Sequence, residues 1–179
     1  EFRRVLFRSL ELLEIKKPDF DDDTKKILGR LNRATANMEH LIKSFLWLSR
    51  HRNLDKFERR DIRVADVVQE IIQENAYLID NKPVEVVVHD AYEIHINVEP
   101  QLIKILIANL IRNSFTYTKS GTVDIYLSSH CIRVHDSGTG IKGETLLQLK
   151  NSNAKNHAEG FGFGLAIVRR LCVSLGWDF

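Results

Sequence analysis

Apolar residues recur at alternating intervals of three and four positions between residues 27 and 48. The series consists of Ile27, Leu31, Ala34, Met38, Leu41, Phe45 and Leu48. Such spacing places one narrow apolar stripe along a helix. We therefore expect this helix to complete a bundle with a second copy of the chain, although the stripe could instead pack on the globular part of the same chain.

A shorter apolar segment at residues 10–15 precedes this helix, and a loop separates the two. Pro18 and a run of aspartates interrupt the helical pattern, and Asp22 or Asp23 is expected to cap the helix that follows. Residues 10–50 are therefore predicted to form part of a dimerisation helical hairpin. Residues 1–9 fit nothing downstream and resemble a translated adapter sequence, so we treat them as a non-native scar.

Beyond a charged linker at residues 51–61, helical and strand patterns alternate over residues 62–179. Pro100 suits the first turn of a long helix, and the alternation of Val123, Ile125 and Leu127 indicates a strand. The order predicts an α+β fold, an α/β sandwich whose mixed sheet is covered by helices on one face. The predicted helices cover residues 66–79, 100–115, 143–149 and 163–175, and the predicted strands cover residues 62–64, 84–88, 94–96, 122–127 and 131–135.

Composition narrows the kinds of ligand. The chain has 26 Lys and Arg against 24 Asp and Glu, and its net charge of +2 gives no general attraction to nucleic acid. No apolar run reaches the roughly 18–20 residues of a membrane span. The two cysteines, Cys131 and Cys172, lack metal-ligand spacing and are expected to be reduced. Any anion must therefore be bound by a local site.

Three patches supply candidates for such a site. Asn109 and Asn113 lie four residues apart, so both amides project from one helix face, and amide oxygens suit Mg²⁺. Asp136, at the end of a predicted strand, can accept a hydrogen bond from an exocyclic amine, and Gly138 and Gly140 would let the backbone approach a flat ring. Taken alone, the first pair could be solvated or capping residues, and the second group could be a turn.

The third patch has alternate glycines at positions 160, 162 and 164, directly before the last predicted helix. Alternate glycines free backbone N–H groups to face a phosphate, and a helix N-terminus adds partial positive charge. The patch lacks the lysine and hydroxyl residue of a P-loop, and no strand leads directly into it as in a dinucleotide fingerprint. It therefore fits neither of these two phosphate-binding motifs.

In this order and spacing, the three patches resemble the Bergerat-type ATP-binding domain and, within that superfamily, the sensor histidine kinases of two-component systems. Residues 109–118 resemble the family's N box, and residues 136–141 and 160–165 resemble its two glycine boxes. The resemblance runs from about residue 10 to residue 179 and includes the hairpin. It implies an ATP- and Mg²⁺-dependent kinase that phosphorylates a histidine for relay to a response regulator.

The resemblance also implies roles for individual residues. Asn109 and Asn113 would be catalytic, with Asn113 as the Mg²⁺ ligand, and Asp136 would bind the adenine amine. Residues 142–159 would form a mobile lid over the nucleotide. The residues expected to bind the nucleotide are Asn109, Asn113, Tyr117, Lys119, Asp136, Gly138, Gly140, Ile141, Gly160, Phe161, Gly162, Phe163, Gly164 and Leu165.

One position separates this chain from the ATP-hydrolysing members of the superfamily. Those members have a Glu four residues before the metal-binding Asn, whereas this chain has Asn109. An amide cannot take a proton from water, so hydrolysis should be slow, while phosphoryl transfer to a protein side chain remains feasible. The alternatives are a Bergerat-type serine kinase and a non-catalytic nucleotide-binding or dimerisation module. Thr116, which stands where a basic residue is usual, and the short lid favour the second alternative.

The same resemblance implies the setting. The hairpin would form a homodimer, and the receiver domain of a response regulator would be the partner. We expect a cytoplasmic domain whose parent meets the inner membrane only through segments upstream. The family's phosphoacceptor motif is absent and would lie upstream of Leu10, since no acidic residue and proline follow His40. The catalytic domain is expected to be truncated at its C-terminus, and the chain to bind nucleotide without phosphorylating itself.

Overall fold

The computed structural model describes residues 21, 23–25, 27–31, 34–35, 38, 42, 44, 46, 58–90, 92–140 and 163–179. The chain divides into two units, Glu1–His51 and Arg52–Phe179, and each is described by itself. The expected helix at residues 143–149 and the expected lid lie outside the described residues. Among the helices of the described residues, none combines the length and the apolar character needed to cross a bilayer.

The first unit begins its described helix with an aspartate cap. Asp21 Oδ1 accepts a hydrogen bond from the amide of Thr24 at 2.9 Å, and the carbonyl of Asp21 accepts one from the amide of Lys25 at 3.0 Å. The hydrogen bonds with Thr24 lower the pKa of Asp21. The cap is therefore Asp21, since a capping carboxylate bonds an amide two or three residues ahead. The prediction of Asp23 as the cap is wrong, because Asp23 already lies inside the helix, and Asp22 lies outside the described residues.

The apolar stripe of this helix lies only partly within the described residues. All described residues from 23 to 46 are helical. Ile27, Leu31 and Met38 are exposed, with 55%, 49% and 60% of their surface accessible. The remaining large members of the stripe, from Leu41 to Leu48, are outside the described residues. Pairing with a second copy therefore stays a prediction.

The second unit is built on a mixed sheet, as predicted. β2 (Val84–Asp90) lies parallel to β4 (Gly121–Ser128), and β4 runs antiparallel to β5 (Cys131–Asp136). β1 (Arg60–Arg63) and β3 (His95–Val98) form a separate antiparallel pair. The strands thus form two hydrogen-bonded groups, with orders β2-β4-β5 and β1-β3. The parallel neighbours β2 and β4 need a long crossover connection, which a helix normally supplies.

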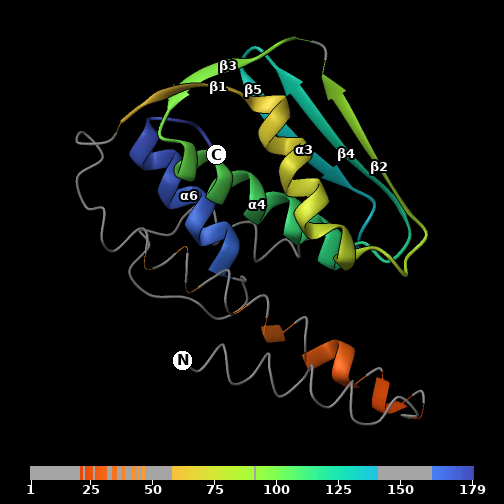
Figure 1. Cartoon of the computed structure of the whole chain (residues 1–179). Coiled ribbons are helices and arrows are strands. Elements are labelled where there is room, and N and C mark those ends of the chain that lie inside the picture. Colours follow the sequence, from red (N-terminus) through yellow and green to blue (C-terminus); the bar gives the residue numbers. More distant parts are fainter. Residues whose placement is uncertain are drawn as a thin grey trace. The chain divides into compact units, whose positions relative to one another are not determined.

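Helices cover one face of this sheet (Figure 1). α3 (Val64–Asn75) leads into a short 3₁₀ turn, η2 (Ala76–Leu78), α4 (Pro100–Tyr117) lies in the crossover between β2 and β4, and α6 (Phe163–Leu175) packs on α4. The core lies between the helices and the sheet. The largest side chains with almost no accessible surface are Phe115, Ile71, Ile103, Ile107, Ile111, Ile125, Leu127, Leu171, Val64, Val68, Val123 and Val168.

Helix α4 is central to the packing because it contacts α3, α6 and β5. Its first turn is closed by Glu99, whose Oε2 accepts a hydrogen bond from the amide of Leu102 at 2.8 Å. Ile103, Ile107 and Ile111 recur every four residues and are completely buried. This spacing aligns them on one face of the helix, and that face enters the core.

Polar contacts fix the second half of α4. Lys82 Nζ donates to the carbonyl of Phe115 at 2.5 Å, near the helix C-terminus, where a cation complements the partial negative charge of the helix dipole. Arg112 Nη1 donates to Asn75 Oδ1 at 2.5 Å and to Tyr77 Oη at 3.0 Å. The last two turns of α4 are therefore tied to α3, η2 and the start of β2.

Helix α6 ends in a glycine cap. The amide of Trp177 donates to the carbonyl of Cys172 at 2.8 Å, and the amide of Gly176 donates to the carbonyl of Val173 at 3.3 Å. Gly176 has φ of +69°, the left-handed conformation that this C-terminal motif requires. Of the two free cysteines, Cys172 is buried on α6 and Cys131 is exposed, and burial raises the pKa of the Cys172 thiol.

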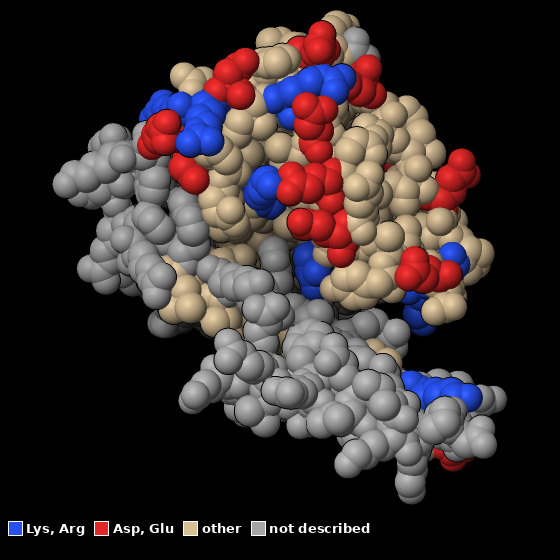
Figure 2. Space-filling model, viewed as in Figure 1, with Lys and Arg blue, Asp and Glu red and all other residues tan. Residues whose placement is uncertain are grey.

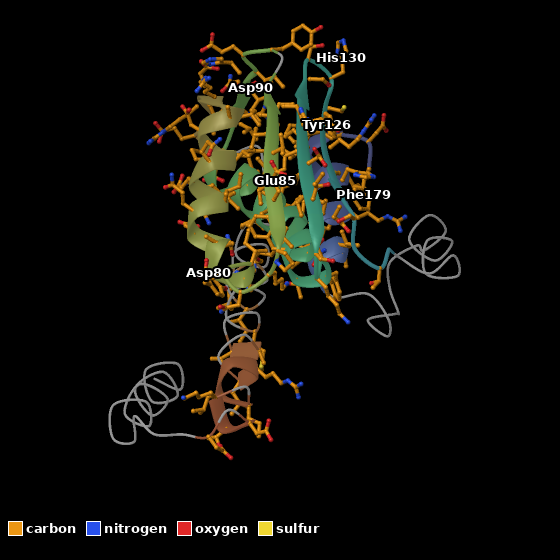
Figure 3. The ribbon with its side chains drawn as sticks, turned by 90° about the vertical axis from the view of Figure 1, so that its right-hand side faces the viewer. Asp80, Glu85, Asp90, Tyr126, His130 and Phe179 are labelled. Atoms are coloured by element: carbon orange, nitrogen blue, oxygen red, sulfur yellow. The ribbon has the colours of Figure 1, made fainter. Side chains whose placement is uncertain are left out.

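The outer face of the three-stranded sheet carries polar side chains (Figure 3). The ring of His89 stacks on that of Tyr126, with centroids 4.3 Å apart and planes 6° from parallel. His89 Nε2 also lies 2.9 Å from Asp124 Oδ1. This hydrogen bond is the largest of the effects that lower the pKa of Asp124. On the helical side, Figure 2 shows Lys and Arg interspersed with Asp and Glu, without a large area of either sign.

Candidate functional site

The two asparagines of the first patch lie one turn apart on α4. Asn109 is buried, with 3% of its surface exposed, and Asn113 is half-buried. Asn109 Nδ2 donates a hydrogen bond of 2.7 Å to the carbonyl of Ile105. Because the amide nitrogen is engaged by its own helix, Oδ1 is the atom that Asn109 presents to its surroundings.

The first turn of α6 lies directly against this asparagine pair. Gly164 is buried, and a Cβ added to it would lie 2.9 Å from Asn109 Oδ1 and 3.5 Å from Asn113 Oδ1. Only glycine therefore fits at this point without displacing the amides. The fold thus brings the first and third patches together, although they are distant in the sequence.

Asp136, at the end of β5, is hydrogen-bonded to Ser114 of α4, which directly follows Asn113. The half-buried carboxylate accepts two hydrogen bonds of 3.0 Å, one at Oδ2 from Ser114 Oγ and one at Oδ1 from the amide of Gly138. Ser114 was not among the predicted site residues. In the sequence, Ser114 could be noticed only as a short polar residue directly after Asn113.

The glycines after Asp136 are required for two different reasons. A Cβ on Gly138 would lie 2.7 Å from Asp136 Oδ1 and 2.9 Å from the carbonyl oxygen of Tyr117, so there is no space for a side chain. Gly140 has open space around it, but its φ of +68° is a conformation that other residues rarely adopt. The segment therefore passes close to the end of α4 and then turns.

A second serine that the sequence did not reveal ties this segment to β4. Ser137 Oγ accepts a hydrogen bond from the amide of Thr122 at 2.9 Å and donates one to the carbonyl of Ser120 at 3.1 Å. It also fills the space in which Gly121 has no side chain, since a Cβ there would lie 2.2 Å from the Ser137 hydroxyl. The residue that follows Asp136 is thus anchored to β4 and to the turn before it.

Other predicted site residues lie at the edges of this arrangement. Tyr117 ends α4 with 57% of its surface exposed, Lys119 is exposed in the following turn, and Leu165 is half-buried in the first turn of α6. Thr118, between the first two, is completely buried, and its hydroxyl has no hydrogen-bond partner among the described residues. Ile141, Gly160, Phe161, Gly162 and the side chain of Phe163 lie outside the described residues.

The set of donors and acceptors fits a magnesium nucleotide better than a metal held by protein alone. Within the described residues, no three His, Cys, Asp or Glu side chains come together to hold a metal ion. The amide oxygens of Asn109 and Asn113 can supply one or two hard ligands, and Mg²⁺ commonly completes its shell with phosphate oxygens and water. The start of α6, which can attract phosphate, lies against the same amides. Asp136 can accept a hydrogen bond from a ligand amine.

The sequence is similar to known proteins. Residues 97–179 match the profile of the family described as histidine kinase-, DNA gyrase B-, and HSP90-like ATPase. Sensor protein QseC of Escherichia coli strain K12 is 28% identical over 167 residues, which cover 88% of this chain and 37% of QseC. Sensor histidine kinase AtsR of Burkholderia thailandensis is 26% identical over 183 residues, which cover 93% of this chain and 30% of AtsR. The chain spans about a third of the length of these relatives.

Solved structures show the same fold. The cytoplasmic segment of histidine kinase QseC superposes with a TM-score of 0.56 at 20% identity, covering 87% of this chain and 82% of that one. Full-length ShkA in complex with AMPPNP gives a TM-score of 0.60 at 17% identity, covering 94% of this chain and 37% of that one. The predicted α+β fold of the second unit is confirmed by this likeness.

Proposed function

Because residues 97–179 form a domain of the histidine kinase-, DNA gyrase B- and HSP90-like ATPase family, we propose that the chain is the ATP-binding catalytic region of a sensor histidine kinase. It would transfer the γ-phosphoryl group of Mg-ATP to a histidine, from which an aspartate of a response regulator would receive it. One observation carries the proposal. Gly164, from the third patch, lies against the amides of Asn109 and Asn113, while Asp136 is joined to the residue that follows them.

In this proposal, one group of described residues binds the base of the nucleotide and another group binds its phosphates. Asp136 accepts a hydrogen bond from the adenine amine, and Gly138 leaves room for the ring. Asn113 Oδ1, supported by Asn109, faces the phosphates, which the start of α6 attracts. The magnesium ion, when bound, neutralises phosphate charge. Phosphoryl transfer depends mainly on positioning and charge stabilisation, and Asn109 cannot act as a base for water, so transfer to a side chain is favoured over hydrolysis.

The proposal also covers the oligomeric state, the partner and the cellular location. The exposed stripe of Ile27, Leu31 and Met38 fits a bundle with a second copy of the chain. The resulting homodimer would act on the receiver domain of a response regulator and would work in the cytoplasm, as the named segment of QseC does. The mixed charge of the helical side gives no reason to expect a nucleic-acid partner.

The test is Mg²⁺-dependent binding of a non-hydrolysable ATP analogue, measured by titration calorimetry. Asp136→Asn should abolish detectable binding, because the amide cannot accept as the carboxylate does and brings its own donors. Asn113→Ala should retain weak binding that no longer responds to Mg²⁺. Glu85→Gln removes a carboxylate from an exposed position on the outer face of the sheet and should bind as the unaltered chain does. A folded, unaltered chain that binds no analogue would refute the proposal.

The kind of phosphate ester formed separates the histidine kinase from its nearest rival. Phosphohistidine is acid-labile, whereas phosphoserine is acid-stable. When the parent protein is incubated with labelled ATP, label that survives acid treatment would identify a serine kinase. Nucleotide binding without any labelled product would identify a non-catalytic module, an outcome that the exposed Thr116 in place of a basic residue would help to explain.

A further inference from the structure

The carboxylate of Asp136 is held at both of its oxygens by the protein itself. Ser114 Oγ donates to Oδ2, the amide of Gly138 donates to Oδ1, and each distance is 3.0 Å. Ser114 is itself buried, with 5% of its surface exposed. The amide of Gly138 belongs to the backbone two residues ahead, so the serine is the one of these two donors that lies on a side chain and can be replaced without altering the backbone.

Two donors at opposite oxygens determine where the remaining acceptor sites point. An ionised carboxylate has about four lone-pair positions. Gly138 alone would fix one oxygen and leave the carboxylate free to turn about that hydrogen bond. The second bond, from Ser114, fixes the plane of the group. The positions that remain are therefore available to a ligand in a single orientation.

The serine also connects the two ends of the site. Ser114 follows Asn113 directly on α4, and the polar contacts of Arg112 hold the same turn from the opposite side. A single helical turn thus carries the amide expected to face the phosphates and the hydroxyl that holds Asp136. Because the turn is rigid, the distance between these two groups is fixed before any ligand arrives.

We propose that Ser114 is a positioning residue that orients the Asp136 carboxylate toward the amino group at position 6 of the purine, and so selects amino-purine over oxo-purine nucleotides. This inference rests on the proposed function. A fixed carboxylate gains a hydrogen bond from a 6-amino group but meets a second acceptor when the purine carries a 6-oxo group. Sites built to bond a polar substituent discriminate strongly against analogues that cannot form the bond.

The experiment compares ATP with inosine triphosphate, whose base carries oxygen at position 6. Both are titrated calorimetrically in Mg²⁺ against the unaltered chain and Ser114→Ala. The alanine variant should bind ATP about tenfold more weakly, because a carboxylate that is free to turn must be ordered when the ligand binds. Its affinity for inosine triphosphate should change less than twofold. The ratio of the two affinities should therefore fall about tenfold.

Two further variants separate positioning from simple packing. Ser174→Ala, at an exposed position on α6 where the hydroxyl donates to the carbonyl of Arg170 in its own helix, should leave both affinities unchanged. Ser114→Cys keeps a donor at the same position, although the donor is weaker and the sulfur atom is somewhat larger than oxygen, and it should give an intermediate ratio. If Ser114→Ala does not fold, the cysteine variant decides: an unchanged ratio would overturn the inference.

The outcomes distinguish this inference from the proposed function. If the unaltered chain binds neither nucleotide, the proposed function fails first. If it binds both equally, or if Ser114→Ala weakens both by the same factor, nucleotide binding stands but Ser114 does not select the base.

Discussion

Replacing Gly164 by alanine would test whether the start of α6 and the asparagine pair act as one unit. The new Cβ would lie 2.9 Å from Asn109 Oδ1, whereas ordinary contacts begin at 3.4 Å, so the two atoms must separate by about half an ångström. Asn109 cannot swing away freely, because it is buried and its nitrogen bonds the carbonyl of Ile105. The clash must therefore displace the side-chain amides of the two asparagines, the first turn of α6, or both.

The expected magnitudes differ for stability and for binding. Overpacking of this kind costs about 1–3 kcal/mol, while alanine gains about 1 kcal/mol over glycine inside a helix. The free energy of unfolding should therefore fall by no more than about 2 kcal/mol. Affinity for a Mg-ATP analogue should fall about tenfold, since a displacement of about 1 Å in a positioned group can cost a hundredfold and this shift is half as large.

Titration calorimetry measures the affinity and urea unfolding measures the stability of the same samples. Gly176→Ala is the matched control, because it places alanine at φ of +69° with no atom within 4 Å. It should lose about 1–2 kcal/mol of stability through backbone strain and keep its affinity. If Gly164→Ala bound the analogue as tightly as the unaltered chain, the contact between α6 and the asparagine pair would have no role in binding.

Two predictions concern the fold itself. Phe115→Ala removes a completely buried ring and should lower the free energy of unfolding by about 3–5 kcal/mol in urea; a loss below about 1 kcal/mol would contradict the assigned core. Asp124→Asn tests the hydrogen bond between Asp124 and His89. The folded-state pKa of Asp124 is lowered, so its ionised carboxylate stabilises the fold above the ordinary aspartate pKa of about 4. This stabilisation is lost as the pH falls through the folded-state pKa. The variant should therefore unfold more readily than the unaltered chain at pH 7, and this difference should disappear once the pH lies below the folded-state pKa of Asp124. An equal difference at pH 7 and in strong acid would contradict this explanation.

The helices and strands of the second unit could be predicted because each has a signal within its own sequence. Pro100 indicates the start of α4, and Val123, Ile125 and Leu127 alternate on the buried face of β4. The structure confirms these elements, with ends shifted by a few residues. Helix and strand periodicities are properties of single segments, so they need no knowledge of how the segments pack.

The contacts that shape the candidate site were less predictable, because they join segments that are distant in the sequence. The sequence indicated that Asp136 and Gly164 matter, but not that Ser114 bonds the first or that Asn109 limits the space at the second. Such contacts depend on the approach of β5 and α6 to α4. The aspartate cap was missed for a more local reason, since several neighbouring aspartates were equally suitable by type and only the backbone selected Asp21.

Helix α4 has a further consequence for how the site behaves over time. Its residues alternate between the core, as at Ile111 and Phe115, and the candidate site, as at Asn109, Asn113 and Ser114. The amides and the hydroxyl cannot open locally unless the core opens with them, so this half of the site has the same cooperative stability as the whole domain. A ligand therefore meets a surface that is already ordered and loses little conformational entropy here. For the same reason, substitutions that destabilise the core would also reduce the specificity of ligand binding, so stability and specificity would evolve together.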